Sequence, residues 1–563
     1  MVGRGVSRGA SSEGLVADLP SSSPSSLTMR PPSIGVLREA YSKWERRAPL
    51  TPAHVGRATA NGLRVLVQPC TKRVFSDAEY AAAGAQIVED LSPATAILGV
   101  KQPMLGSLLP ERTHMFFSHT IKGQPENMPL LDEALAKRVR MIDYECVREN
   151  GSESGPRLIA FGEFAGKAGL ISGLRGLGLR LLALGHSSAL LGIGPPHSYL
   201  TYSDARRALG IAGRQIAEHG LPTRYAPMVI GVIGQGNVAR GAIDAIEALD
   251  GEGIESSWAT SSAKGGDRVV EWVGVEDLAA LSVLAGTPGP HQHKVYCVRL
   301  GVSDIVARSD GGRFDKAEYY SQPELYAPVF HRLIAPHVSM LVTTMYWDRR
   351  FPRLLTSEQL RELGSDDERR LLAVADLTCD VNGAVEALTR ISTIDDPFYM
   401  YDTRSGHEGV RGVDGPGIVM LGVDILPAEL PREASAHFGD CLLPFLGPLA
   451  SYNPCANTMT SRATLPPELE AATITAGGRL RPSFKYIDGM RRLAKRKDPS
   501  ARALALQGST VLSLRGHLFD SGFINSALDA VEKAGGRFDM LDVQVRLEHV
   551  FNCPKRKCSF YRL

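Results

Sequence analysis

The sequence predicts an α/β protein with two domains, each built on a parallel sheet covered by helices, and with a cleft between the domains. Three observations support this prediction. Short apolar runs alternate with helix-like stretches from Ile34 onwards, which is typical of a parallel sheet. A strand, a glycine turn and a helix follow one another near residue 230 and begin a second such series. The chain of 563 residues is also longer than one hydrophobic core usefully serves.

Charge and cysteine usage narrow the class of protein. The chain has 63 Lys and Arg against 61 Asp and Glu, a net charge of +2, so no broad attraction to nucleic acid or to an anionic membrane is expected. The eight cysteines are scattered, which fits reduced thiols better than a disulfide framework. The most apolar stretch, 170–184, contains two arginines and predicts no membrane span. We therefore expect an intracellular protein that acts on small molecules.

Apolar runs mark the expected strands of the first domain, at 34–37, 65–67, 96–100, 115–117 and 141–142. Arg47 follows the first run, Lys101 the third and His119 the fourth. Open α/β sheets bind ligands at the carboxyl ends of their strands, so we expect these three basic side chains to lie in one site. Each also has a structural alternative. Arg47 alone would more often lie on the surface, Lys101 could reach solvent at a strand end, and His119 could cap a helix or lie in the core.

A glycine-rich segment at 161–169 leads into apolar residues up to Leu184. Small residues at helical spacing permit close packing. The segment therefore predicts a long helix that passes from the first domain to the second.

The segment 229–241 has a dinucleotide-binding fingerprint in its required context of strand, turn and helix. Gly234 allows the tight turn, and Gly236 lets the backbone approach a pyrophosphate. The helix N-terminus then faces the phosphates, so Asn237 and Val238 are also expected to contact the cofactor. The alternative is a glycine-rich turn without a ligand.

Two carboxylates end later apolar runs. Asp376 follows 371–375 and Asp424 follows 418–423, so both are expected at strand ends on the nicotinamide side. Capping of a helix N-terminus by Asp fits each position nearly as well.

The cofactor is expected to be NADPH or NADP+, with NAD as the alternative. An acidic ligand for the ribose of NAD is expected about 20 positions after the fingerprint, but Glu276 and Asp277 follow the next expected strand, 268–273, where we would not place one. Lys264 and Arg268 could meet a 2′-phosphate. They could equally be solvated loop charges.

Several motifs, in chain order, resemble one family. They include WERRAPLTP at 44–52, ILGVKQP at 97–103, FFSHTIK at 116–122, IDYE at 142–145, AFGEFAG at 160–166, YW at 346–347, ADLTCD at 375–380 and VDILPAELPREAS at 423–435. Over about 34–490 the chain resembles the lysine-ketoglutarate reductase half of the bifunctional aminoadipic semialdehyde synthases. A more distant likeness is to fungal saccharopine dehydrogenase, alanine dehydrogenase and the transhydrogenase nucleotide domain. The resemblance implies two Rossmann-like domains, of which the first is discontinuous.

The resemblance also implies a reaction, in which the ε-amine of L-lysine joins the keto carbon of 2-oxoglutarate and NADPH reduces the imine to saccharopine. The substrates bring three carboxylates, which need fixed cations, and the condensation needs proton transfers. By resemblance, Lys101 and His119 are the acid/base pair and Arg47 binds substrate. Lys122 could add positive charge, and Glu145 is expected to tune the pair. Asp376 and Asp424, by the same resemblance, border cofactor or substrate.

One departure from the family pattern lies at 380–386, where the family has two adjacent glycines and this chain has Asn382 and Gly383. Asn tolerates left-handed geometry better than most residues, so we expect the turn to be kept.

The expected division of the chain is a disordered extension at 1–32, a substrate domain at 33–165 and 428–490, a dinucleotide-binding domain at 166–427, a linker at 491–508, a βαβ fragment at 509–546 and an unstructured tail at 547–563. The fragment resembles the start of the domain that joins the two halves of plant-like bifunctional enzymes, and the saccharopine dehydrogenase half is not expected in this chain. Plant-like linker residues favour the cytoplasm, with the mitochondrion as the alternative. We expect no metal site, and a homo-oligomer is possible.

Two other functions stay open at this point. One is an amino acid dehydrogenase like alanine dehydrogenase, which acts on a small 2-oxo acid with ammonia. The other is a catalytically weak homologue that binds nucleotide as a regulatory module.

Overall fold

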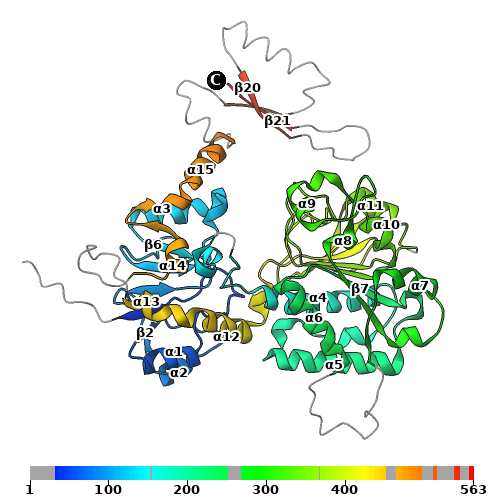
Figure 1. Ribbon diagram of the computed structural model, residues 1–563, viewed down its shortest axis with the longest axis horizontal. Helices are drawn as coiled ribbons and strands as arrows, with labels where there is room; N and C mark the ends of the chain where they lie inside the picture. Colours follow the sequence, from blue (N-terminus) through cyan, green and yellow to red (C-terminus); the bar gives the residue numbers. More distant parts are fainter. Residues whose placement is uncertain are drawn as a thin grey trace, which may run out of the picture.

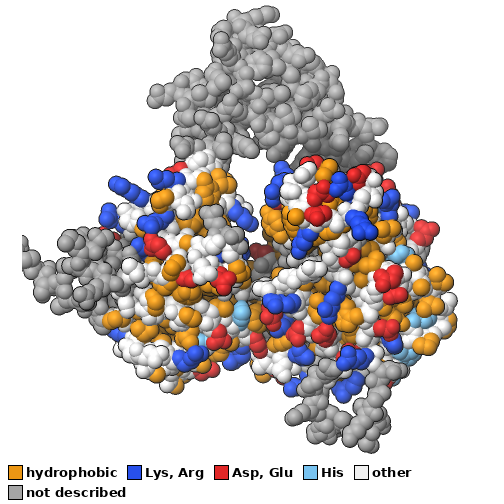
Figure 2. Space-filling view, in the orientation of Figure 1, with side chains coloured by type: hydrophobic (Ala, Val, Ile, Leu, Met, Phe, Trp, Pro, Cys, Tyr) orange, Lys and Arg blue, Asp and Glu red, His pale blue; other side chains and the backbone are white. Residues whose placement is uncertain are grey.

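The computed structural model describes residues 32–152, 155–251, 268–366, 368–451, 464–497, 511–515, 538–544 and 557–562. Two eight-stranded sheets form two lobes that lie side by side (Figure 1). A furrow separates the lobes on the face seen in Figure 2. The predicted α/β class with two Rossmann-like domains is therefore confirmed. In the part of the chain that the structure describes, no helix is both long and apolar enough to cross a membrane.

The first sheet has the strand order β18-β17-β6-β5-β4-β1-β2-β3. Its strands are β1 (Ser33–Val36), β2 (Arg64–Val67), β3 (Gln86–Ile87), β4 (Ala96–Leu98), β5 (Thr113–Phe116), β6 (Arg140–Asp143), β17 (Thr473–Ala476) and β18 (Arg479–Leu480). The first six run parallel in the order 3-2-1-4-5-6, which is the order of a dinucleotide-binding fold. β17 pairs antiparallel with β6 although it follows the whole second sheet in the chain. The first domain is therefore discontinuous, as predicted.

The strands that the sequence analysis located in this domain are buried along their length. Every residue of β1, β4, β5 and β6 is buried. Parallel sheets are covered on both faces, so their strands form continuous apolar runs. The two-residue edge strand β3 has neither residue fully buried, and it was not predicted.

The second sheet has the order β15-β14-β16-β13-β12-β7-β9-β8. Its strands are β7 (Met228–Ile233), β8 (Val270–Trp272), β9 (Val295–Leu300), β12 (Met340–Thr343), β13 (Ala373–Asp376), β14 (Phe398–Asp402), β15 (His407–Arg411) and β16 (Ile418–Leu421). All except β14 and β15 run parallel. A separate antiparallel pair joins β10 (Val306–Arg308) to β11 (Tyr326–Pro328). β9, and not β8, is the neighbour of β7, so the chain inserts a strand that we did not predict beside the fingerprint strand.

Helices cover both sheets. They are α1 (Pro52–Ala60), α2 (Asp77–Ala82), α3 (Met128–Ala136), α4 (Gly162–Ala183), α5 (Tyr202–His219), α6 (Asn237–Glu247), α7 (Leu278–Val283), α8 (Val302–Ile305), α9 (Lys316–Ser321), α10 (Phe330–Leu333), α11 (Ser357–Glu362), α12 (Pro431–Leu442), α13 (Leu446–Ser451), α14 (Pro467–Ala471) and α15 (Tyr486–Lys497). In Figure 1, α12 begins at the boundary between the lobes and leads back under the first sheet.

The long helix predicted after residue 161 is α4, and its glycines explain its packing. A Cβ on Gly166 would lie 1.9 Å from the carbonyl oxygen of Val238, and one on Gly241 would lie 1.9 Å from that of Glu163. α4 and α6 therefore cross where only glycine fits. Farther along, α4 contacts β12, β13 and β16, so it carries the chain from the first domain onto a face of the second sheet (Figure 1).

The C-terminal region differs from its prediction. β19 (Val511–Arg515) and β20 (Phe538–Gln544) fit the two strands of the expected βαβ fragment, and the segment between them, where its helix was expected, lies outside the described residues. β21 (Lys557–Arg562) pairs antiparallel with both. The prediction of an unstructured tail at 547–563 is therefore wrong for 557–562, and the βαβ fragment is part of a three-stranded antiparallel sheet. β19 and β20 do not pair with each other, so β21 satisfies backbone groups that the fragment alone would leave open.

The linker predicted at 491–508 is also wrong at its start. α15 is helical through Lys497, so the basic run 491–497 belongs to a helix. Arg491 binds Asp132 of α3 and lies 3.7 Å from Asp488, one turn earlier. These contacts fasten α15 to the first domain.

Candidate active site

The strand order of the first sheet changes direction between β1 and β4, and the loops after these two strands meet there. Open α/β sheets bind ligands at this switch point. The loop after β1 carries Glu39, Glu45 and Arg47, and the loop after β4 carries Lys101. The structure thus brings two of the predicted site residues together with two acidic residues that sequence reasoning did not select.

Arg47 is buried, with a side chain 3% exposed. Its Nε and Nη2 donate to the two carboxylate oxygens of Glu45 at 2.8 and 2.6 Å, and its guanidinium lies 4.3 Å from the ring centre of Phe161. The surface alternative is therefore wrong. Glu45 takes the bidentate edge of the guanidinium, and Nη1 is the donor that it does not use. In the sequence, the Glu two residues before Arg47 was the signal that could have indicated this ion pair.

Lys101 lies between charges from both domains. Its ammonium is 5.2 Å from the ring centre of Tyr41. Burial lowers the pKa of Lys101 and the charge of Arg47 lowers it further, while the carboxylates of Glu45 and Asp424 oppose this shift. Asp424 belongs to the second domain, so groups from both sides of the furrow act on this amine.

Glu39 fixes the backbone at Lys101. Its two carboxylate oxygens accept hydrogen bonds from the amides of Val100 and Lys101, at 2.5 and 3.1 Å. The side chain is buried, and burial together with the charge of Glu45 raises the pKa of Glu39 to about 7. One acid thus links the loop after β1 to the loop after β4.

His119 begins the turn after β5 in a left-handed conformation, with φ 52°. Its side chain caps no helix, so the capping alternative is wrong. The ring stacks on Phe117 at 6.3 Å, and Nδ1 lies 3.7 Å from Oε1 of Glu145. The side chain is 34% exposed, which leaves one side of the ring open to a ligand.

Asp143, at the end of β6, fixes the backbone next to His119 and at Glu145. Its Oδ2 accepts from the amide of Ser118 at 3.1 Å and from the Ser118 hydroxyl, and its Oδ1 accepts from the amide of Glu145 at 2.8 Å. Burial and the charge of Glu145 raise the pKa of Asp143 to about 6. The sequence marked this residue only as part of a motif.

Glu145 stays charged in spite of its burial. Burial alone would raise its pKa, but His119, Arg157 and Lys122 together lower it. Its Oε2 is buried without a hydrogen-bond partner in the described parts of the chain. Lys122 is exposed and also opposes the burial-driven rise in the pKa of Asp380, in the second domain. The charge of Lys122 therefore acts on carboxylates of both domains.

The fingerprint turn has the expected geometry. Gly234 has φ +121°, and a Cβ there would lie 2.2 Å from Oγ1 of Thr344. A Cβ on Gly236 would meet no atom within 4 Å, and α6 begins at Asn237 without a side-chain cap. Exposed amides at a helix N-terminus fit the pyrophosphate of a dinucleotide. Val238 also packs against α4, where its carbonyl oxygen approaches Gly166.

The two strand-end carboxylates of the second domain differ. Asp376 is fully buried; Oδ1 accepts from the amide and hydroxyl of Thr378 at 3.0 and 2.6 Å, while Oδ2 is buried without a partner in the described chain. Burial raises the pKa of Asp376. Asp424 is exposed. The structure has no helix directly after Asp376, so it stabilises a turn and not a helix N-terminus. Asn382 has φ 50°, as expected for that turn.

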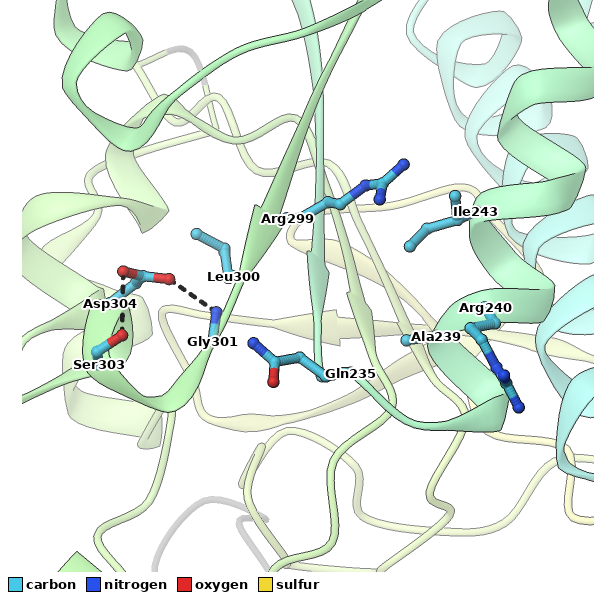
Figure 3. A pocket seen from close by; sticks show the side chains of 10 residues that line it. Gln235, Ala239, Arg240, Ile243, Arg299, Leu300, Gly301, Ser303 and Asp304 are labelled. Atoms are coloured by element: carbon cyan, nitrogen blue, oxygen red, sulfur yellow. Dashed lines mark hydrogen bonds between the residues drawn. The ribbon is translucent and has the colours of Figure 1, made fainter. Parts of the chain in front are cut away.

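A pocket of about 360 Å³ lies beside the fingerprint turn, at the carboxyl end of β9 (Figure 3). Its polar lining consists of Gln235, Arg240, Arg299, Ser303 and Asp304. Sequence reasoning missed these side chains because it took β8 as the neighbouring strand.

The basic residues that sequence reasoning selected for a 2′-phosphate lie elsewhere. Arg268 precedes β8 and so lies at the opposite edge of the sheet from the fingerprint turn. Lys264 lies outside the described residues.

Among the described residues, no group of three His, Cys, Asp or Glu side chains could hold a metal ion. His291 is buried, and its Nε2 lies 2.9 Å from the carbonyl oxygen of Thr287.

Two family matches agree with this architecture. Residues 35–168 match the family described as alanine dehydrogenase/PNT, N-terminal domain, and residues 509–549 match the LOR/SDH bifunctional enzyme conserved region. Strands β2 to β6 of the first sheet thus lie within the region that resembles the alanine dehydrogenase/PNT N-terminal domain. A solved L-alanine dehydrogenase covers 81% of this chain and 99% of its own at 18% identity, with a TM-score of 0.48.

The chain is a homologue of the alpha-aminoadipic semialdehyde synthases, and the predicted resemblance is confirmed. It is 40% identical over 519 residues to the synthase of Arabidopsis thaliana, covering 90% of this chain and 46% of that protein. The mitochondrial synthase of Rattus norvegicus is 35% identical over 478 residues, 83% of this chain and 48% of its own length. A saccharopine dehydrogenase (NAD(+), L-lysine-forming) of Emericella nidulans is 22% identical over 420 residues, covering 73% and 90%. The chain spans about half the length of the synthases.

Proposed function

We propose that the chain is a lysine-ketoglutarate reductase. It joins the ε-amine of L-lysine to the keto carbon of 2-oxoglutarate and reduces the product to saccharopine with a nicotinamide nucleotide. The observation that carries this proposal is that Arg47, Lys101 and His119 follow the neighbouring parallel strands β1, β4 and β5 at their carboxyl ends. The 40% identity to the Arabidopsis synthase supports it.

The reaction needs proton transfers at the candidate acid/base pair. The lysine amine must lose a proton before it attacks, and the carbinolamine must gain one to expel water and give the imine. Burial and Arg47 lower the pKa of Lys101, which favours proton exchange nearer neutral pH. His119 has Nδ1 3.7 Å from Oε1 of Glu145, which orients the ring. Bound NADPH supplies the hydride that turns the imine into the secondary amine.

The three substrate carboxylates require cations in the same furrow. Arg47 offers Nη1, because Glu45 holds Nε and Nη2. Lys122 is exposed after β5, and Arg157, 46% exposed, lies 3.9 Å from Oε1 of Glu145. Charge-assisted hydrogen bonds from such groups are the usual means of holding carboxylates.

The proposed division of labour follows the two sheets. Residues 33–165 and 428–490 form the substrate domain, since β17 and β18 complete the sheet that carries the candidate acid/base pair. Residues 166–427 form the dinucleotide-binding domain, with Gly234 and Gly236 at the pyrophosphate and Asp376 and Asp424 beside the nicotinamide.

One assay on the full chain tests this function. We expect NADPH oxidation that requires lysine and 2-oxoglutarate together, with saccharopine identified by mass spectrometry. Oxidation with ammonia and pyruvate, without lysine, would overturn the proposal in favour of an alanine-dehydrogenase-like enzyme. Nucleotide binding without turnover on either substrate set would overturn it in favour of a regulatory module.

The cytoplasm is the proposed compartment. The Arabidopsis relative is named without a compartment, whereas the rat, mouse and bovine relatives are named mitochondrial. A fluorescent fusion to the C-terminus of the full chain should give a cytoplasmic signal. A signal that coincides with mitochondria would contradict the proposal.

A further inference from the structure

We propose that Tyr486 and Met490 of α15 are positioning residues for Lys122, and that they place its ammonium against a carboxylate of one substrate. The inference rests on the proposed function, because it takes a carboxylate-bearing substrate as the ligand of Lys122. In Figure 1, α15 stands beside α3 in the first lobe. It meets the turn after β5 although Ile121 and Tyr486 are 365 positions apart in the sequence.

The two contacts of α15 lie on either side of Lys122. The Tyr486 hydroxyl donates to the carbonyl oxygen of Ile121 at 3.1 Å. A Cβ built on Gly123 would lie 2.8 Å from Cβ of Met490 and 3.3 Å from its Sδ, so Met490 packs directly on the backbone of Gly123. Tyr486 and Met490 are four positions apart and so share one face of the helix. That face holds the backbone before and after Lys122, whose own side chain is exposed.

The two ends of this turn have separate supports. Residues Thr120–Lys122 form a short 3₁₀ helix between two left-handed residues, His119 with φ 52° and Gly123 with φ 63°. Thr120 is buried, and its hydroxyl lies 2.8 Å from that of Ser118, which ties the start of the turn to the end of β5. α15 supports the other end, which carries the lysine and not the histidine.

α15 is itself held in place on a second face. Phe484, just before the helix, and Ile487 are buried in the core of the first domain. Arg491, one turn after Ile487, binds Asp132 of α3. A side chain is positioned accurately when the residues that support it are themselves fixed by packing and hydrogen bonds. α15 meets this condition.

The charge of Lys122 is the means by which this support reaches the site. Burial raises the pKa of Asp380 and would raise that of Glu145, and the charge of Lys122 opposes both effects. A cation that acts on carboxylates of both domains is suited to bind a substrate carboxylate between them. A lysine side chain is flexible, so the position of its ammonium depends on a fixed backbone.

Steady-state kinetics on the full chain test the inference. Lys122→Met should raise the KM of one substrate, L-lysine or 2-oxoglutarate, by roughly 10- to 100-fold. Tyr486→Phe and Met490→Ala should each raise the KM of that same substrate roughly 3- to 10-fold, and leave kcat and the other KM nearly unchanged. Met490→Leu, which nearly keeps the side-chain volume, should behave like the unaltered chain.

A double variant provides the readout that a purely structural role would not change. In a chain that carries Lys122→Met, Tyr486→Phe should have no further effect on KM, because a positioning residue acts only through the residue that it places. Tyr320→Phe is the matched control, since Tyr320 of α9 is 52% exposed and Tyr486 is 49% exposed. It should leave both KM values unchanged.

Four results would overturn the inference: Lys122→Met changes neither KM, its effect adds to that of Tyr486→Phe, the α15 variants weaken both substrates equally, or they lower kcat alone. Calorimetric titration of each substrate needs no turnover and separates this failure from failure of the proposed function. A chain that makes no saccharopine, but whose variants weaken binding of one substrate without adding, refutes the function alone. A chain that makes saccharopine and whose variants add refutes the positioning role alone.

Discussion

The carboxyl ends of the two sheets are built in opposite ways. In the first domain, buried carboxylates accept backbone hydrogen bonds and fix the loops: Glu39 at Lys101, and Asp143 beside His119. In the second domain, the equivalent loop is bare backbone, since nothing lies within 4 Å of a Cβ built on Gly236.

This difference separates two kinds of site. Proton transfer needs side chains held at a fixed angle and a fixed charge, because small misplacements are costly in rate. A long phosphate-bearing ligand instead needs open space and free amides. Side-chain removal should therefore damage the first site, whereas side-chain addition should damage the second.

The largest effect is expected at the proposed acid/base pair. Lys101→Met and His119→Gln should each lower turnover by roughly 10²- to 10⁴-fold and leave nucleotide affinity almost unchanged, because the proposed nucleotide site uses backbone of the other domain. Steady-state kinetics and a nucleotide fluorescence titration measure the two effects. Lys316→Met, at an exposed lysine of α9, is the control. Intact turnover in both variants would show that the roles are wrong.

The buried ion pair between Glu45 and Arg47 should matter for stability. Glu45→Gln leaves the Arg47 charge buried and uncompensated, which costs about 3–5 kcal/mol of unfolding free energy. Glu45→Gln combined with Arg47→Met should recover much of that loss. Urea denaturation followed by fluorescence compares the three proteins. A Glu45→Gln protein as stable as the unaltered chain would contradict a stabilising ion pair between Glu45 and Arg47.

The carboxylates that fix the loops should act on rate more than on binding. Glu39→Ala removes both acceptors for the amides of Val100 and Lys101, and a shift of about 1 Å at Lys101 can cost up to about 100-fold in turnover. Asp143→Ala should do the same at His119. Glu39→Gln keeps one acceptor and should fall in between. Unchanged turnover in both alanine variants, with the fold retained by circular dichroism, would rule out this role.

The two fingerprint glycines form a matched pair with smaller effects. Gly234→Ala strains a backbone at φ +121° and meets Thr344, so it should lower the unfolding free energy by about 1–3 kcal/mol. Gly236→Ala meets no atom and should stay within about 0.5 kcal/mol. Both should weaken nucleotide binding, because a methyl group fills the space that the pyrophosphate needs. Equal stability of the two variants would contradict the geometry of the turn.

The smallest effect is a shift in pH dependence. The charge of Arg47 lowers the pKa of Lys101 and that of Glu45 raises it. Arg47→Met should therefore move the titration of Lys101 to higher pH, and Glu45→Gln should move it to lower pH. The rate of reaction of Lys101 with an amine reagent, followed by mass spectrometry across pH, measures this. Shifts in the same direction would refute the electrostatic argument.

The sequence predicted the parts of the fold that depend on local pattern. Continuous apolar runs located β1, β2, β4, β5 and β6, because strands of a covered parallel sheet are buried on both faces. The rule that ligands meet strand ends then selected Lys101 and His119 for the furrow. The glycine spacing also predicted α4, whose crossing with α6 needs glycine.

What the sequence did not predict depends on how distant segments fold back. Glu39 and Glu45 lie on one loop whose path sets their partners. The spacing of Glu45 from Arg47 was its one local signal, and nothing in the local pattern distinguishes Glu39 from an exposed acid. The insertion of β9 next to β7 moved the pocket away from Arg268, because strand order is a tertiary property. The same holds for β21, whose pairing with two preceding strands gives order to a segment without a strong pattern of its own.

The return of the chain to the first sheet has a consequence for biosynthesis. Thr473 pairs with Ile142, so the ribosome must deliver the whole second lobe before the first sheet can acquire its last strands. Until then, β6 is an edge with unpaired backbone groups, and such edges promote pairing with other chains. The nucleotide lobe, which is contiguous, can become compact during this interval. The chain should therefore be most prone to aggregate in the interval after β6 is synthesised and before β17 pairs with it.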